Sequence, residues 1–208
     1  MTTPLVFDLD GTLVDSLVGI AEALNRALAE ARHPTHSLDA VRSFIGNGSL
    51  ELARRALPAD STLSPADLES SFRLHYAHTW QQGTQPYPGI LDLLARLHHR
   101  PLAVLSNKPD AFTQDIVAAI FPAGTFTHVI GQSDRFPRKP APDALLHLCQ
   151  QWDCPPPAVT LIGDSLPDLE SATRAGCRFL GVGWGYHPQA LGASALPDVP
   201  ALAAVLGA

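Results

Sequence analysis

Short apolar runs and segments with a helical period alternate along most of the chain. The apolar runs are typical of buried strands and lie at 5–7, 102–105, 129–130, 159–162 and 179–182. Helical patterns lie between them, at 90–99, 111–120, 143–152 and 168–175. This alternation predicts an α/β fold built on a doubly wound, parallel, Rossmann-like sheet.

The segment 16–85 departs from this alternation. It contains successive helical patterns at 17–32, 38–44, 50–57 and 66–82, without a convincing strand. The cluster Pro86-Tyr87-Pro88-Gly89 follows it, and two prolines with a glycine are typical of a turn. We therefore predict an inserted α-helical domain over 16–85 and an α/β core formed by 1–15 and 86–208.

Charge and hydropathy narrow the class of partner. The 208 residues carry a formal net charge of −6 at pH 7, which argues against a nucleic-acid surface. No apolar stretch approaches the roughly 18–20 residues of a membrane span. Met1-Thr2-Thr3-Pro4 lacks the basic start and apolar run of a signal peptide. We expect a cytoplasmic monomer or homodimer that binds a small molecule and neither a nucleic acid nor a membrane.

Polar motifs stand where the predicted strands end. In order they are Asp8-Leu9-Asp10-Gly11-Thr12, Ser106-Asn107-Lys108, Arg138-Lys139-Pro140 and Gly163-Asp164-Ser165-Leu166-Pro167-Asp168. Ligands of doubly wound sheets bind beyond the carboxyl ends of the strands, so these motifs are expected to share one crevice. Each motif alone could be a turn or a helix cap, since Asp, Ser and Gly favour both. Four motifs in this order favour a shared site instead.

The residue types in these motifs predict phosphate and metal chemistry. Converging carboxylates repel one another unless cations neutralise them, and oxygen ligands without His or Cys favour Mg²⁺. The candidate metal ligands are Asp8, Asp10 and Asp164. Ser106 and Asn107 lead into a predicted helix whose amino end attracts anions, which suits a phosphate. Only two of the 14 basic residues are lysines, Lys108 and Lys139, and both lie in these motifs.

The four ordered motifs resemble those of the haloacid-dehalogenase-like hydrolases, over essentially the whole chain. The resemblance implies that Asp8 is the nucleophile and Asp10 the general acid and base. It implies that Ser106 and Lys139 hold phosphate and that Asp164 binds Mg²⁺. Asp168 would support the water shell of the metal. The inserted helices would then form a cap over the site that reads the leaving group.

The resemblance also separates the activities within that family. Carbon–halogen-cleaving members lack the second Asp, so Asp10 argues against a dehalogenase. Phosphonate-cleaving members need a cap lysine, and the sequence has none between Gly11 and Gln85. A non-catalytic relative would be expected to have lost a charged site residue, and all are present here. The prediction is a Mg²⁺-dependent phosphatase for a small phosphorylated metabolite.

The predicted cap favours one substrate. Gly46, Asn47 and Gly48 stand between two helical patterns, where glycines let backbone N–H groups approach a ligand. This loop and the Arg-containing helix after it, with Arg54 and Arg55, resemble those of phosphoglycolate phosphatases. Gly185-Tyr186-His187 resembles that subfamily too, although His187 is expected to be a surface residue. For the loop of Gly46, Asn47 and Gly48 and the helix after it, the alternative is an ordinary helix–helix turn with solvated arginines.

The leading substrate is therefore 2-phosphoglycolate. The alternatives are a broad-specificity sugar-phosphate, nucleotide or pyrophosphate phosphatase, or a phosphoglucomutase-like isomerase.

Overall fold

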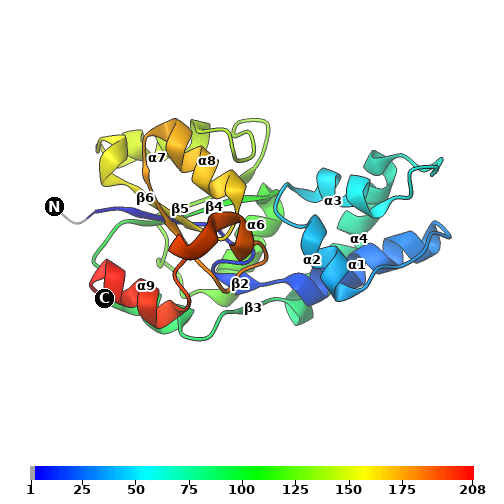
Figure 1. Cartoon of the computed structure of the whole chain (residues 1–208), viewed down its shortest axis with the longest axis horizontal. Helices are drawn as coiled ribbons and strands as arrows, with labels where there is room; N and C mark the ends of the chain where they lie inside the picture. Colours follow the sequence, from blue (N-terminus) through cyan, green and yellow to red (C-terminus); the bar gives the residue numbers. More distant parts are fainter. Residues whose placement is uncertain (1–2) are drawn as a thin grey trace.

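A five-stranded parallel sheet forms the centre of the protein (Figure 1). The computed structural model describes residues 3–208 and orders the strands β5-β4-β1-β6-β7. The pairings β1–β4, β1–β6, β4–β5 and β6–β7 are all parallel. The predicted doubly wound α/β fold is therefore confirmed. The strands are β1 (Leu5–Phe7), β4 (Leu102–Pro109), β5 (His128–Gln132), β6 (Thr160–Gly163) and β7 (Arg178–Gly181).

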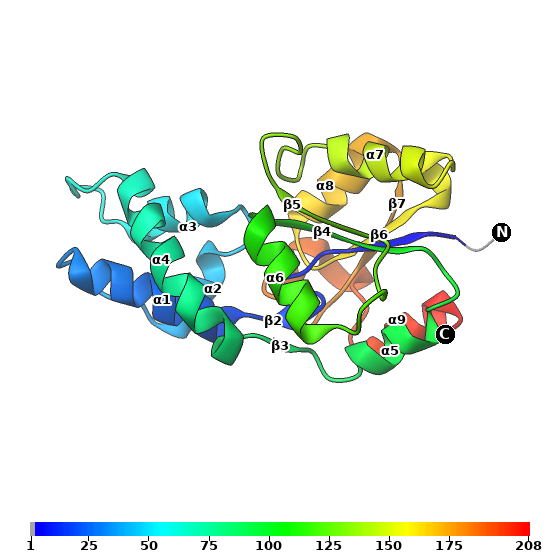
Figure 2. The ribbon, with the colours of Figure 1, turned by 180° about the vertical axis from the view of Figure 1, so that it is seen from behind.

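Helices cover both faces of this sheet (Figures 1 and 2). Side chains alternate along β1, so Val6 packs into the cluster on one face, and Leu5 and Phe7 pack into the cluster on the other. The Val6 face is covered by α7 (Asp143–Gln151) and α8 (Leu166–Ala175). The opposite face is covered by α5 (Ile90–Arg96), α6 (Asp110–Ile120) and α9 (Val199–Leu206). Two 3-10 segments complete the core, at Pro156–Ala158 and Pro188–Ser194.

Four helices form a separate body beside the sheet, which we call the cap (Figure 1). They are α1 (Leu17–Glu30), α2 (Leu38–Phe44), α3 (Ser49–Ala56) and α4 (Pro65–Gly83). The cap is joined to the core by an antiparallel ribbon of β2 (Val14–Asp15) and β3 (Gln85–Pro86). The predicted domain boundaries fall in this two-stranded ribbon, which the hydropathy pattern did not indicate.

The register of the sheet determines which residues meet at the carboxyl ends of its central strands. Phe7 lies beside Val104 of β4 and beside Ile162 of β6. The backbone N–H of Asp8 continues the ladder by donating to the carbonyl of Ile162 at 2.9 Å. Residues just after these three positions therefore lie next to one another at the carboxyl ends of the strands, which face the cap (Figure 1).

The helices of residues 3–208 include none that is both long enough and apolar enough to cross a membrane.

Candidate active site

A buried ion cluster lies at the carboxyl ends of the strands, with Lys139 at its centre. The Nζ atom of Lys139 lies 2.7 Å from Asp8 Oδ1 and 2.6 Å from Asp168 Oδ1. It also donates to the carbonyl of Leu105 at 2.8 Å. Burial alone would lower the pKa of Lys139, but the charges of Asp168 and Asp8 raise it above its ordinary value. The two acids thus favour the charged form of the Lys139 ammonium.

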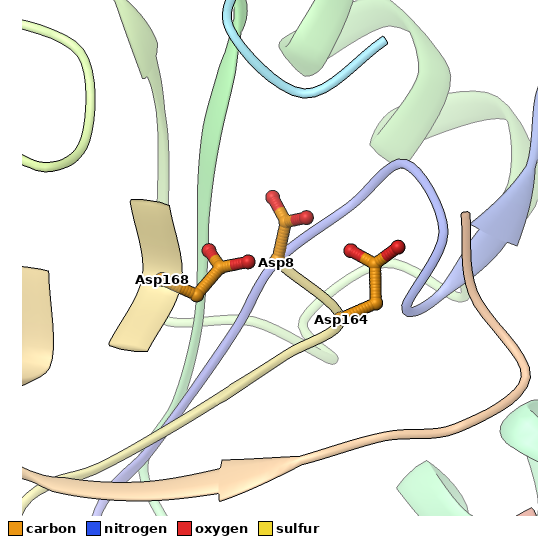
Figure 3. Close-up of side chains that lie close together, drawn as sticks. All are labelled: Asp8, Asp164 and Asp168. Carbon is orange, nitrogen blue, oxygen red and sulfur yellow. The ribbon is translucent and has the colours of Figure 1, made fainter. Parts of the chain in front are cut away.

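The carboxylates of Asp8, Asp164 and Asp168 converge on one space (Figure 3). One oxygen from each lies within 4.8 Å of the others, and all three residues are buried. Burial, together with the charges of Asp168 and Asp164, raises the pKa of Asp8 well above its ordinary value. Burial and then Asp168 raise the pKa of Asp164 to about 7. A divalent cation would relieve this repulsion, so the cluster suits a hard metal ion.

Two glycines leave room for the Asp164 carboxylate. A Cβ atom on Gly11 would lie 2.4 Å from Asp164 Oδ2, and one on Gly185 would lie 2.3 Å from the same atom. The backbone N–H of Tyr186 donates to that oxygen at 2.6 Å. Asp164 is therefore held between two chain segments that no side chain separates from it. The metal-binding role of Asp164 stays a prediction.

Asp168 holds Lys139 rather than pointing freely into the cavity. One of its oxygens accepts from Lys139, and the other accepts from the hydroxyl and backbone N–H of Ser165 at 2.5 and 3.2 Å. The bond from the Ser165 N–H is one half of a capping box at the start of α8. The same carboxylate thus begins the helix and positions the lysine. Its predicted support of a metal's water shell stays a prediction.

Asp10 lies in the same crevice, but its carboxylate has different partners from those of Asp8. Asp10 Oδ1 accepts from the Ser16 hydroxyl at 2.6 Å. Asp10 Oδ2 lies 2.9 Å from the Nζ atom of Lys108. The structure therefore brings Asp8 and Asp10 together at one site, as their spacing predicts, and points the two carboxylates at different cations. Metal binding by Asp10 stays a prediction.

The two predicted phosphate residues of β4 differ in what their side chains contact. Ser106 is buried and lines the crevice, and its hydroxyl accepts from the backbone N–H of Lys108 at 3.2 Å. The Asn107 amide binds backbone instead. It donates to the carbonyls of Gly46 and Lys139 at 3.0 Å each, and its oxygen accepts from the Lys139 N–H at 2.6 Å. Asn107 thus ties the lysine loop to the cap loop.

The cap loop of residues 45–48 lies over the crevice and contacts the core at several points. His187 Nε2 lies 2.8 Å from the carbonyl of Ile45. Arg138 donates to the carbonyl of Asn47 at 3.1 Å. Gly46 and Gly48 line the cavity beneath the loop, which has a volume of about 60 Å³. His187 is half-buried at this junction and is not simply a surface residue.

The two cap arginines point elsewhere. Arg54 and Arg55 both pair with Glu51 of their own helix, at 2.5 and 2.8 Å. Arg55 also approaches the carbonyls of Ser43 and Phe44. Arg54 is 62% exposed and Arg55 31% exposed, so these contacts favour the alternative of solvated arginines for Arg54 more than for Arg55.

Tyr186 contacts residues of the site, although we predicted no role for it from the sequence. Its N–H binds Asp164, and its hydroxyl donates to Asp15 at 2.9 Å and accepts from the Ser16 N–H at 2.8 Å. The only available signal was its place in the Gly185-Tyr186-His187 motif.

A family model for haloacid dehalogenase-like hydrolases matches residues 5–182. The chain belongs to this family. The phosphoglycolate phosphatase of Escherichia coli strain K12 is 34% identical to it over 207 residues, which cover 88% of this chain and 82% of that protein. The predicted enzyme class is therefore confirmed: this haloacid dehalogenase-like hydrolase is a phosphoric monoester hydrolase.

Solved structures agree with the family assignment. A protein from Lactobacillus delbrueckii subsp. bulgaricus, itself assigned only by inference as a phosphoglycolate phosphatase, superposes with a TM-score of 0.89 at 28% identity. That match covers 100% of this chain and 99% of the other. CbbY from Rhodobacter sphaeroides, solved in complex with phosphate, gives a TM-score of 0.78 at 25% identity, covering 94% of this chain and 92% of CbbY.

Proposed function

We propose that this hydrolase is a Mg²⁺-dependent phosphatase that transfers the phosphoryl group of a small ester to Asp8, with 2-phosphoglycolate as its substrate. One observation carries the proposal. The Asp8 carboxylate borders the cavity beneath the cap, and its Oδ1 atom lies 2.7 Å from the Nζ atom of the buried Lys139. A carboxylate can attack a phosphate dianion only if nearby positive charge reduces the repulsion between them.

The chain's own residues divide the reaction between them. An oxygen of Asp8 attacks phosphorus, and Asp10 gives a proton to the departing alkoxide oxygen. Asp10 then takes a proton from the water that cleaves the aspartyl phosphate. Such proton transfers contribute about 10²–10⁴-fold in rate. Lys139 balances the charge of the phosphoryl oxygens, and the Ser106 hydroxyl is placed to donate to one of them.

Mg²⁺ would be held by Asp8 and Asp164, and it would supply further positive charge to the phosphoryl oxygens. Asp10 is kept as a third candidate ligand from the sequence, although its carboxylate contacts Ser16 and Lys108 here. Asp168 acts on this centre indirectly, because it fixes Lys139. In the same way Asn107 acts on the phosphate by fixing the Lys139 backbone.

The cavity favours a small leaving group. Its volume of about 60 Å³ is less than half of the ~150 Å³ that accommodates benzene in a protein interior. Gly48 has a φ of 84° and forms the amino end of α3, so its loop can bring backbone N–H groups toward an anionic group. The carboxylate of phosphoglycolate suits both features. The names of the curated relatives support the same substrate.

A panel of phosphate esters tests this proposal. Purified protein is assayed with Mg²⁺ on 2-phosphoglycolate, sugar phosphates, a sugar bisphosphate, nucleotides and pyrophosphate. We expect the highest kcat/KM for 2-phosphoglycolate, by at least about tenfold, since a missing partner for a buried polar group is costly. A sugar bisphosphate as the best substrate would contradict the phosphoglycolate assignment, and similar values throughout would show a broad-specificity phosphatase.

A further inference from the structure

The second buried lysine, Lys108, holds the Asp10 carboxylate. It lies in β4, two residues after Ser106, and its side chain is only 6% exposed. Its Nζ atom lies 2.9 Å from Asp10 Oδ2, while the Ser16 hydroxyl donates to Asp10 Oδ1 at 2.6 Å. Both oxygens of Asp10 are therefore held, one of them by an ammonium at the end of a flexible chain.

That ammonium is itself fixed by Tyr76 of the cap. The Tyr76 hydroxyl accepts a hydrogen bond from Lys108 Nζ at 2.9 Å, and the same nitrogen lies 4.6 Å from the centroid of the tyrosine ring. Tyr76 is 1% exposed. Its ring stacks on Phe72 of the same helix and meets the edge of Phe112, which belongs to α6 of the core. Tyr76 thus contacts Lys108 while packed between cap and core.

We propose that Lys108 and Tyr76 are positioning residues for Asp10, and that Tyr76 makes this positioning depend on where the cap lies. The contacts form a chain from cap helix α4 through Tyr76 and Lys108 to Asp10. If α4 moved away from α6, Lys108 would lose a hydrogen-bond acceptor and an aromatic face at once. Its four-carbon stem would regain rotamer freedom, and Asp10 Oδ2 would lose its fixed partner.

This inference rests on the proposed role of Asp10 as general acid and base, and it has a chemical signature. An alkoxide is a strong base and needs a proton as it leaves, whereas p-nitrophenolate is a weak base and leaves without one. The ratio kcat/KM reports steps up to and including departure of the leaving group. Poor positioning of Asp10 should therefore lower kcat/KM for alkyl phosphates and spare p-nitrophenyl phosphate.

Tyr76→Phe is the sharpest test, because it removes the hydroxyl and keeps the ring. We expect kcat/KM for an alkyl phosphate to fall by about tenfold or more, since general acid catalysis is worth about 10²–10⁴-fold. For p-nitrophenyl phosphate we expect a change within about twofold, because no proton is required. Thr79→Val is the matched control. It removes another buried hydroxyl of α4, which donates to the Gly19 carbonyl at 2.9 Å inside the cap, and both esters should respond alike.

A double-mutant cycle tests the order of the contacts. If Tyr76 acts through Lys108, the double variant Tyr76→Phe/Lys108→Met should lose no more activity on the alkyl ester than Lys108→Met alone. Additive losses would overturn the chain of contacts. An equal fall for both esters in Tyr76→Phe, or no fall for either, would overturn the positioning role.

The choice of ester keeps this test separate from the substrate assignment. Any alkyl phosphate that the wild-type protein hydrolyses can serve, so a failure of 2-phosphoglycolate as substrate leaves the ratio measurable. Should Tyr76→Phe not fold, Lys108→Met by itself must show the same selective loss, and an unselective loss there would refute the inference.

Discussion

Replacing Lys139 with Met should destabilise the protein strongly as well as inactivate it. The substitution keeps an unbranched side chain in a site where the lysine is 3% exposed, and it removes the charge shared by Asp8 and Asp168. Removing one partner of a buried ion pair costs about 3–5 kcal/mol, because the remaining charge is left unbalanced. Since a domain has only about 5–15 kcal/mol in total, the loss is a large share of its stability.

The pH dependence of this loss follows from the acids left behind. Burial already raises the pKa of Asp8 in the folded protein above its value in the unfolded chain, and Lys139 acts in the opposite direction. Without the lysine that pKa rises further. A carboxyl group whose folded pKa is the higher one contributes less stability as pH rises through the interval between the two values. The cost of Lys139→Met should therefore be greater at pH 8 than at pH 5.

Urea unfolding of the metal-free protein, followed by tryptophan fluorescence, measures this cost. Arg26→Met is the matched control, because Arg26 pairs with Glu22 on the exposed face of α1. That pair should contribute about 0–1 kcal/mol. The coupling energy between Lys139 and Asp168 is then obtained from a double-mutant cycle with Asp168→Asn. A loss below about 1 kcal/mol for Lys139→Met at pH 8 would refute the claim that this ammonium balances the buried acids.

Three further predictions concern the metal and the cap. Gly185→Ala puts a Cβ 2.3 Å from Asp164 Oδ2 and should weaken Mg²⁺ activation about 10–100-fold, whereas Gly192→Ala, with nothing within 4 Å, should leave it unchanged. A fixed concentration of Mg²⁺, set at 100 times its Kd at pH 8, should raise Tm by about 5–10 °C at pH 8 and by less at pH 6. Burial and Asp168 raise the pKa of Asp164 to about 7, so protons compete with the metal at the lower pH; equal shifts would count against Asp164 as a ligand. Gly48→Val puts a side chain against the Asn107 carbonyl and should lower turnover of 2-phosphoglycolate far more than that of p-nitrophenyl phosphate, and an equal fall would argue against a specificity loop.

The strands and most helices could be predicted from sequence because their periods are simple. Apolar runs indicated β1, β4, β5, β6 and β7, and successive helical patterns without a strand between them indicated the cap. The strand order and register could not be predicted, since they depend on which strands pair. Helix α9 (Val199–Leu206) was missed because it is apolar on nearly all sides and has no polar face to reveal a helical period.

The candidate site was predictable to the extent that it lies at strand ends. Asp8, Lys139 and Asp164 meet there, as the order of their motifs indicated. The contacts of long side chains were not predictable. Lys108 was noted as a rare lysine, but nothing in the sequence showed that it pairs with Asp10 or that its other partner, Tyr76, comes from the cap. Such pairs depend on how the cap and the core pack together.

The identity of the nucleophile is the central claim, and trapping the phosphorylated protein tests it most directly. Asp10→Asn should slow cleavage of the aspartyl phosphate, because no base then activates the water. This variant is mixed with Mg²⁺ and p-nitrophenyl phosphate, quenched in acid, digested and sequenced by mass spectrometry. The account predicts one phosphoryl group on Asp8 and none in Asp8→Asn/Asp10→Asn. A phosphoryl group on another residue, or turnover retained by Asp8→Asn in the otherwise unchanged protein, would contradict it.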